Sequence, residues 1–229
     1  MARVHTVSVV DAIADDLRKA VLRGELAPGT PLTEADIAGR YDVARPTGKA
    51  AIEQLVHDGL FERGAHKSAR VVRLGVNDVR DIYTTRAHME REAVRRLAAV
   101  GADIPDARDS NALIAEGSAS DIVASDLRFH IAIIDALKSP RTSRIYHSLV
   151  TEVTLCMVHV QGRGLLETSL IAGEHAHILD LISRGAGNEA ADLLDKHLAR
   201  ARERLVGAIG GDPGPEADLG PQQRHPDRA

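Results

Sequence analysis

Aromatic residues are scarce in this chain of 229 residues: they make up 2% of it, and Trp is absent. The core must therefore be built mainly from Ala, Leu, Ile and Val, which suits packed helices. A single cysteine, Cys156, excludes an intramolecular disulfide framework and fits a reducing cytosol. The chain also lacks an apolar run of about 18 residues, the length that a membrane span needs. From these absences we expect a cytoplasmic protein.

The chain has nearly equal numbers of basic and acidic residues. The formal net charge is −4, from 29 Lys and Arg against 33 Asp and Glu. Bulk electrostatics therefore gives no indication of nucleic-acid binding, and any basic surface must be local.

The first part of the chain has the pattern of three helices. Residues 9–23 place apolar side chains at helical spacing, and a segment rich in Gly and Pro ends this helix. Thr33 and Asp36 form a start signal for a short helix over residues 34–40. A third helix follows a tight connection, with Pro46 tolerated in its first turn.

Two short β-like pieces, residues 60–63 and 69–74, follow the third helix. Three helices and a small hairpin in this order outline a winged helix-turn-helix. We therefore expect residues 1–75 to form a DNA-binding domain of that kind.

Beyond residue 75 the pattern is helical, and no stretch alternates convincingly as a strand. The expected fold class is mainly α, with an antiparallel all-α bundle over residues 76–209. Residues 210–229 are rich in Gly and Pro, so we expect a disordered tail. The expected helices cover residues 78–99, 108–116, 119–137, 141–160, 167–184 and 188–207.

Cations gather at two places in the expected DNA-binding domain. Arg45 and Lys49 lie one turn apart at the start of the third helix, and others lie in the expected wing. A helix fits the major groove, where an Arg can bond a guanine edge, while Lys holds phosphates. The alternative is that these cations only form a solvated helix face. We expect DNA contacts from Arg45, Thr47, Lys49, His66 and Lys67.

Two titratable residues, Asp126 and His130, interrupt the apolar stretch SDLRFHIAI. They occupy the inward stripe of the helix over residues 119–137, where a carboxylate needs a partner. His175 and His197 lie on the apolar faces of two later helices. Three imidazoles and one carboxylate directed into a bundle predict a divalent-metal site. The alternatives are core histidines bonded to carbonyls, and a buried hydrogen bond between the first two residues.

The segment GELAPGTPL, residues 24–32, resembles the head of a GntR-type bacterial transcription regulator. Arg45 and Lys49 coincide with the two cations of that family's recognition helix, whereas Ala35 replaces an Arg that often contacts DNA. The resemblance implies a winged helix-turn-helix that binds operator DNA. A homodimer is expected, because two heads must meet two half-sites.

The resemblance extends to the FadR subfamily, whose FCD-type ligand-binding domain is all-helical. Many members bind a metal through an Asp and three His. The short segment 100–118 implies the smaller, VanR-like six-helix form. Arg86 matches an Arg that often pairs with the effector's carboxylate, and the alternative is a salt bridge to Glu90. The metal motifs map onto Asp126, His130, His175 and His197.

The expected function is that of a metabolite-responsive transcription regulator, a repressor and not an enzyme. Its expected ligands are a divalent ion such as Zn, Ni or Mn and a small carboxylate. Two alternatives remain open. The first is a metal-dependent hydrolase, with Glu174 as general base. The second is a regulator in which the four residues form a metal-free polar network beside an acyl-type ligand.

Overall fold

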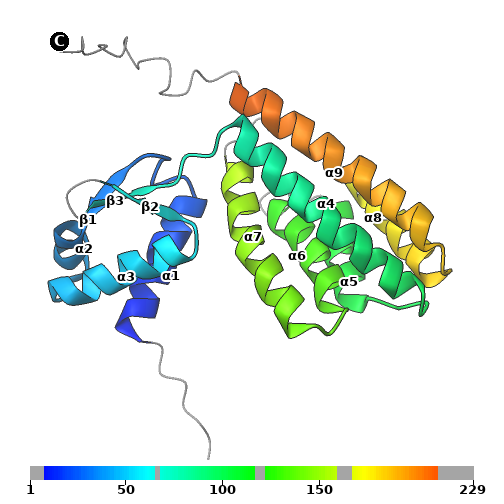
Figure 1. The fold of residues 1–229 in the computed structure, drawn as a ribbon, viewed down its shortest axis with the longest axis horizontal. Helices are drawn as coiled ribbons and strands as arrows, with labels where there is room; N and C mark the ends of the chain where they lie inside the picture. Colours follow the sequence, from blue (N-terminus) through cyan, green and yellow to red (C-terminus); the bar gives the residue numbers. More distant parts are fainter. Residues whose placement is uncertain (1–7, 65–67, 117–121, 159–166, 211–229) are drawn as a thin grey trace, which may run out of the picture.

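A computed structural model of the chain describes residues 8–64, 68–116, 122–158 and 167–210. This part is mainly helical, with one small sheet near its start. Figure 1 shows a head, made of α1–α3 and the sheet, and a bundle of longer helices, α4–α9. The predicted fold class, a winged helix-turn-helix followed by an all-α bundle, is confirmed. Of the predicted tail, residues 211–229 lie outside the described residues.

In the head, α2 and α3 pack against each other and α1 packs on α3. The predicted start of α2 is confirmed by a capping box: Asp36 N–H donates to Thr33 Oγ1 at 3.1 Å, and Thr33 N–H donates to Asp36 Oδ2 at 2.8 Å. Pro46 lies in the first turn of α3. The helices are α1 (Val9–Leu22), α2 (Glu34–Tyr41) and α3 (Arg45–His57).

The sheet has three antiparallel strands in the order β1-β3-β2. They are β1 (Pro31–Thr33), β2 (Phe61–Arg63) and β3 (Ser68–Val71). The predicted hairpin is β2 with β3, which ends earlier than expected. Strand β1 was not predicted, because three residues are too few to show an alternating pattern. Its pairing, with Leu32 opposite Ala69, comes from the tertiary fold.

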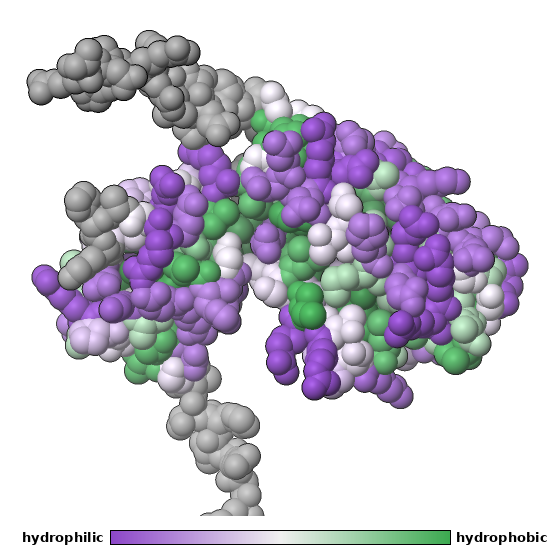
Figure 2. Space-filling view, viewed as in Figure 1, coloured by the Kyte–Doolittle hydropathy of each residue, from purple (hydrophilic) through white to green (hydrophobic). Residues whose placement is uncertain are grey.

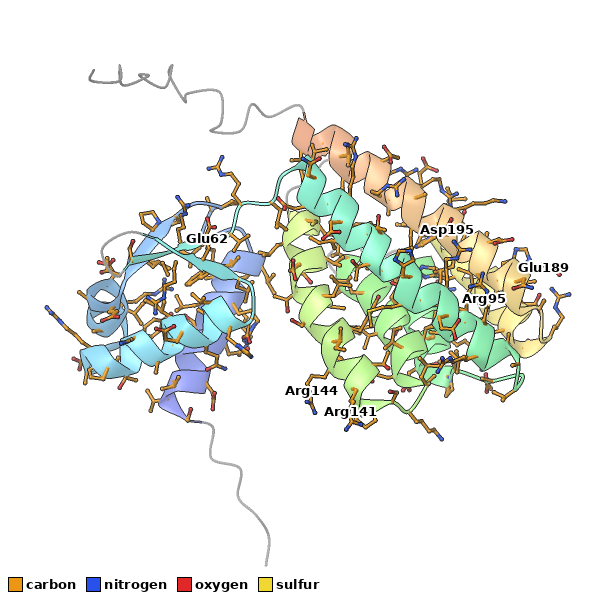
Figure 3. All side chains as sticks on the ribbon, in the orientation of Figure 1. Glu62, Arg95, Arg141, Arg144, Glu189 and Asp195 are labelled. Atoms are coloured by element: carbon orange, nitrogen blue, oxygen red, sulfur yellow. The ribbon has the colours of Figure 1, made fainter. Side chains whose placement is uncertain are left out.

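The bundle has an aliphatic core, and α4 and α9 run along each other at its surface (Figure 1). Hydrophilic residues cover most of the bundle face seen in Figure 2, and charged side chains such as Arg141, Arg144 and Glu189 project outward in Figure 3. None of the described helices combines the length and apolar character of a membrane span. The helices are α4 (Val76–Ala98), α5 (Pro105–Ala115), α6 (Ile122–Asp135), α7 (Pro140–Val158), α8 (Thr168–Ser183) and α9 (Gly187–Gly210).

Two elements of the bundle lie next to the head. Helix α4 begins at Val76, only a few residues after β3 ends at Val71. Leu74, in the connection between them, is buried. Helix α7 contacts α1 directly. The head and the bundle are therefore joined by a short connection and by a direct helix–helix contact.

A glycine sets the close approach of the two helices of the helix-turn-helix. A Cβ on Gly48 would lie 2.9 Å from the backbone oxygen of Glu34, whereas a Cβ on Gly39 would meet nothing within 4 Å. Gly48→Ala should therefore lower the free energy of unfolding by about 1–3 kcal/mol through overpacking. Gly39→Ala should raise it by about 0.5–1 kcal/mol through helix propensity. Urea unfolding measures both, and equal stabilisation of the two variants would contradict the close packing.

Candidate functional site

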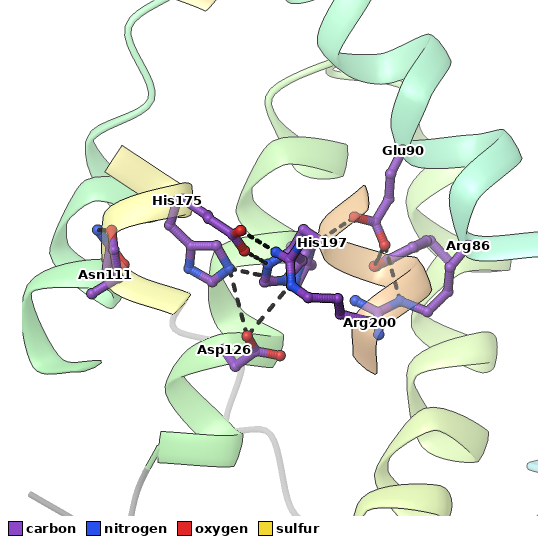
Figure 4. A network of polar contacts seen from close by, with 11 residues as sticks. Arg86, Glu90, Asn111, Asp126, His175, His197 and Arg200 are labelled. Carbon is purple, nitrogen blue, oxygen red and sulfur yellow. Dashed lines mark hydrogen bonds and ion pairs between the residues drawn. The ribbon is translucent and has the colours of Figure 1, made fainter. Parts of the chain in front are cut away.

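Four donor side chains converge in the core of the bundle. Helix α6 supplies Asp126 and His130, α8 supplies His175 and α9 supplies His197. All four are buried, and their ligand atoms lie within 4.8 Å of one another. His175 Nε2 lies 3.4 Å from His197 Nε2 and 3.5 Å from Asp126 Oδ1 (Figure 4). The structure thus brings together the four residues that the sequence singled out as metal ligands.

Helical spacing explains how the chain aims these groups. The buried face of α6 passes through Asp126 and His130, which are one turn apart. His175 lies on the buried face of α8, and His177, two residues further on, is exposed. This difference follows from the rotation of about 200° that two helical residues make.

Two carboxylates outside the cluster orient two of the imidazoles. His130 Nδ1 lies 2.6 Å from Glu90 Oε2, and His197 Nδ1 lies 2.9 Å from Glu174 Oε2. Each contact turns Nε2 of the ring toward the centre of the cluster, which is the usual arrangement around metal-binding histidines. His175 is positioned differently, because its ring stacks on Phe129 with centroids 3.6 Å apart.

The donor set fits a divalent ion. His130 Nε2 is buried and has no hydrogen-bond partner among the described residues. Buried polar atoms usually have a partner, and a neutral imidazole nitrogen without one can bind a metal ion. Burial, and then the neighbouring His130 and His197, hold the pKa of His175 well below its usual range. That keeps the ring neutral, the form that binds metals. Donors about 2.1 Å from a tetrahedral ion are about 3.4 Å apart. Two of the observed donor separations are 3.4 and 3.5 Å, and the whole set lies within 4.8 Å.

A buried carboxylate, Glu90 on α4, connects this cluster to two further helices. Arg86 Nε donates to Glu90 Oε1 at 3.0 Å, and the hydroxyl of Tyr146 on α7 donates to the same oxygen at 2.5 Å. Burial raises the pKa of Glu90, but the charges of His130 and Arg86 and the hydrogen bonds from His130 and Tyr146 outweigh it and lower the pKa to about 2. The sequence singled out Arg86 with Glu90 as a possible ion pair, but gave no sign that Tyr146 or His130 would share the carboxylate.

A cavity of about 50 Å³ lies beside the four donors. Its polar wall includes Arg86, Asp126, His130 and His197. Arg86 therefore forms the salt bridge to Glu90 and also lines the cavity. Its Nη2 is buried and has no hydrogen-bond partner among the described residues.

Three of the five residues expected to contact DNA are described, and they lie on α3 in the head. Arg45 and Lys49 are exposed on α3, and Thr47 between them is half-buried. This placement leaves both cations accessible at the N-terminal end of the helix. His66 and Lys67, predicted in the wing, lie outside the described residues.

The depressed pKa of Glu90 makes its contribution to stability depend on pH. That contribution is present above the ordinary pKa of 4.5 and is lost as the pH falls toward about 2. At pH 7, Glu90→Gln should lower the free energy of unfolding by about 3 kcal/mol, because Arg86 loses its buried partner. The difference from the wild type should shrink below about pH 4.5 in urea unfolding.

The control for this prediction is Glu92→Gln, which removes an exposed carboxylate from the same helix. It should change stability by less than about 1 kcal/mol. A loss in Glu90→Gln that stays constant from pH 7 to pH 3 would contradict the role assigned to the charge.

Comparison with protein families gives two adjoining matches. Residues 9–71 match the family described as bacterial regulatory proteins, gntR family. Residues 81–200, more than half of the chain, match the FCD domain. The first match covers the head and the second covers the bundle with its four donors.

Individual relatives are transcription regulators. An HTH-type regulator, BphR, from Paraburkholderia xenovorans is 28% identical over 158 residues, 64% of each chain. The Nta operon regulator of Aminobacter aminovorans is 22% identical over 190 residues, 80% of this chain and 88% of the relative. The repressor RspR of Escherichia coli is 29% identical over 84 residues, 37% of each chain. The matched region thus spans less than two thirds of BphR and RspR.

Solved structures share the fold. A GntR regulator from Rhodococcus sp. RHA1 superposes with a TM-score of 0.76 at 24% identity, over 88% of this chain and 99% of the other. Escherichia coli McbR/YncC gives 0.67 at 16% identity, with the same coverage. The family matches and relatives are regulators, so the alternative of a hydrolase is wrong. The winged helix-turn-helix, followed by a helical domain of the FCD type, makes this chain a member of the GntR family of DNA-binding transcription regulators.

Proposed function

We propose that the chain is a metabolite-responsive repressor whose bundle binds a divalent metal and a small carboxylate effector. The observation that carries this proposal is the convergence of Asp126, His130, His175 and His197 beside a cavity. We further propose the division into a DNA-binding domain over residues 1–75 and a sensing and dimerisation domain over residues 76–209.

In this proposal Asp126, His130, His175 and His197 hold the metal, and Glu90 and Glu174 fix two of the rings. A bound divalent ion such as Zn, Ni or Mn would supply positive charge that attracts a carboxylate oxygen. Arg86 lines the same cavity and would add the positive charge of its guanidinium. The effector is therefore held by charge on one side and by a fixed guanidinium on the other.

On the DNA side, Arg45 and Thr47 would contact bases and Lys49 the backbone, with His66 and Lys67 of the wing as further contacts. Two copies of the chain would place two α3 helices in successive major grooves, about one helical turn apart. The similarity to RspR, described as a repressor, favours repression as the mode of action.

The proposed coupling runs through two helices that meet both the site and the head. Helix α4 carries Arg86 and Glu90 and begins just after the sheet. Helix α7 carries Tyr146, which bonds Glu90, and it contacts α1. An effector shifts the two heads only as far as its affinity differs between their two arrangements. Ligand contacts that move Arg86 or Glu90 supply such a difference.

Metal analysis tests the metal part of the proposal. Protein purified without chelator or nickel resin should contain about one divalent ion per chain. Inductively coupled plasma mass spectrometry measures this metal content. His175→Ala should lose the ion, because it removes a buried donor. His177→Ala is the matched control, since that residue is exposed on the same helix. A pure, folded wild-type sample without metal would favour the metal-free polar network instead.

Operator binding tests the DNA part. The probe is a duplex selected in vitro by the wild-type protein, and binding is measured by fluorescence anisotropy. Arg45→Ala should weaken binding by about 1–3 kcal/mol and relax specificity at the base it contacts. Lys49→Ala should weaken binding to all sequences and reduce the salt dependence.

Arg184→Ala serves as the control for these variants, because it removes an exposed arginine at the far end of α8. It should leave affinity unchanged. If Arg45→Ala bound the duplex as tightly as Arg184→Ala does, α3 would not be the recognition helix.

A further inference from the structure

One of the three imidazoles in the cluster lacks an acceptor for its second nitrogen. In the other two rings, Nδ1 lies beside the carboxylate of Glu90 or Glu174. Nδ1 of His175 is buried and has no hydrogen-bond partner among the described residues. A histidine that binds a metal through Nε2 carries its proton on Nδ1, where an acceptor holds the ring in place. Metal binding would therefore make this nitrogen a buried donor that needs an acceptor.

Asn111 on α5 has the complementary deficit. Its Nδ2 donates to the backbone oxygen of Ala172 on α8 at 2.9 Å, and this bond fixes the direction of the amide. Its Oδ1 is buried and has no hydrogen-bond partner among the described residues. An amide oxygen is an acceptor, so the group that Asn111 lacks is a donor of the kind that His175 would become.

The fold places this amide beside the imidazole. Helix α5 packs against α8, and Asn111 bonds α8 at Ala172, one turn before His175 on the same buried face. Helical side chains lean toward the N-terminus of their helix, so the ring of His175 covers the turn that Asn111 contacts. In Figure 4 Asn111 lies on the side of His175 that is opposite to His197. Nε2 of His175 is the nitrogen on the His197 side, 3.4 Å from that residue's Nε2.

Solvent cannot supply the missing partners. Nδ1 of His175 and Oδ1 of Asn111 are both sealed from water, so each can be satisfied only by another protein group. A further buried oxygen without a partner among the described residues, Ser125 Oγ on α6, is the competing acceptor. A serine hydroxyl inside a helix can bond the backbone oxygen one turn earlier, an option that the amide oxygen of Asn111 does not have.

We propose that Asn111 is a positioning residue for the metal site, and that its Oδ1 accepts a hydrogen bond from Nδ1 of His175 when Nε2 binds the metal. The bond would hold the third ring as Glu90 and Glu174 hold the other two. This inference rests on the metal part of the proposed function. It assigns α5, which supplies none of the four donors, a role in metal affinity.

The zinc affinity of the full chain, measured by competition with a chelating dye, tests the inference. Asn111→Leu removes the acceptor at similar volume and should weaken zinc binding by about tenfold, as the loss of an outer-shell partner does. Asn111→Asp keeps an acceptor oxygen but loses the donor to Ala172. It should bind zinc about as tightly as the wild type, although its melting temperature without metal should be lower. A bond to Ala172 that is merely structural would predict equal weakening in both variants.

Two variants serve as controls. Asn188→Leu replaces an exposed amide on α9 that bonds Arg95, and it should bind zinc as the wild type does. Ser125→Ala removes the competing acceptor and should also leave the affinity unchanged. Unchanged affinity in Asn111→Leu, a tenfold loss in Asn111→Asp as well, or a loss in Ser125→Ala instead would each overturn the inference.

Nuclear magnetic resonance of zinc-loaded wild-type protein with isotope-labelled histidine gives an independent readout that needs no variant to fold. The Nδ1 proton of His175 should resonate downfield and exchange slowly, as that of His197 does beside Glu174. In Asn111→Leu the His175 resonance should move upfield while that of His197 stays. A wild-type His175 Nδ1 proton without a hydrogen-bond shift would overturn the inference and leave the metal site intact. Wild-type protein that binds no zinc would refute the proposed metal site itself.

Discussion

The buried carboxylate of Glu90 is the group on which the packing of the helical bundle depends. A carboxylate in an aliphatic core is unfavourable unless several donors surround it, and here Arg86, Tyr146 and His130 do so. These partners come from three helices, α4, α6 and α7. The need to satisfy one charge therefore fixes how the helices pack, and it turns His130 Nε2 toward the other donors. The convergence of the four donor side chains is a consequence of that packing.

The same network gives the bundle a physical connection to the head. Helices α4 and α7 each carry a side chain that donates a hydrogen bond to Glu90, and both helices adjoin the winged helix-turn-helix. A ligand that bonds Arg86 competes with or reinforces the existing contacts of that guanidinium. Packed cores shift between discrete arrangements rather than deform smoothly, so in the proposed function a small change there would be passed to the head through these two helices.

Much of the fold and part of the site could be predicted from the sequence, for identifiable reasons. Helical periodicity placed Asp126, His130, His175 and His197 on inward faces, and three helices then brought them together. Strand β1 escaped prediction because its pairing with β3 depends on tertiary contacts. The contact between Glu90 and Tyr146 could not be predicted for the same reason. Tyr146 is 56 residues away in the chain, and no local sequence pattern links it to Glu90.

The central claim is that three imidazoles and one carboxylate bind a divalent ion in the core of the bundle. X-ray absorption spectroscopy of the zinc-loaded full chain tests it most directly, because imidazole rings give a distinctive outer-shell scattering pattern. The account predicts three imidazole nitrogens and at least one oxygen, at about 2.0–2.2 Å. A first shell made only of oxygen atoms, or one that contains sulfur, would contradict it.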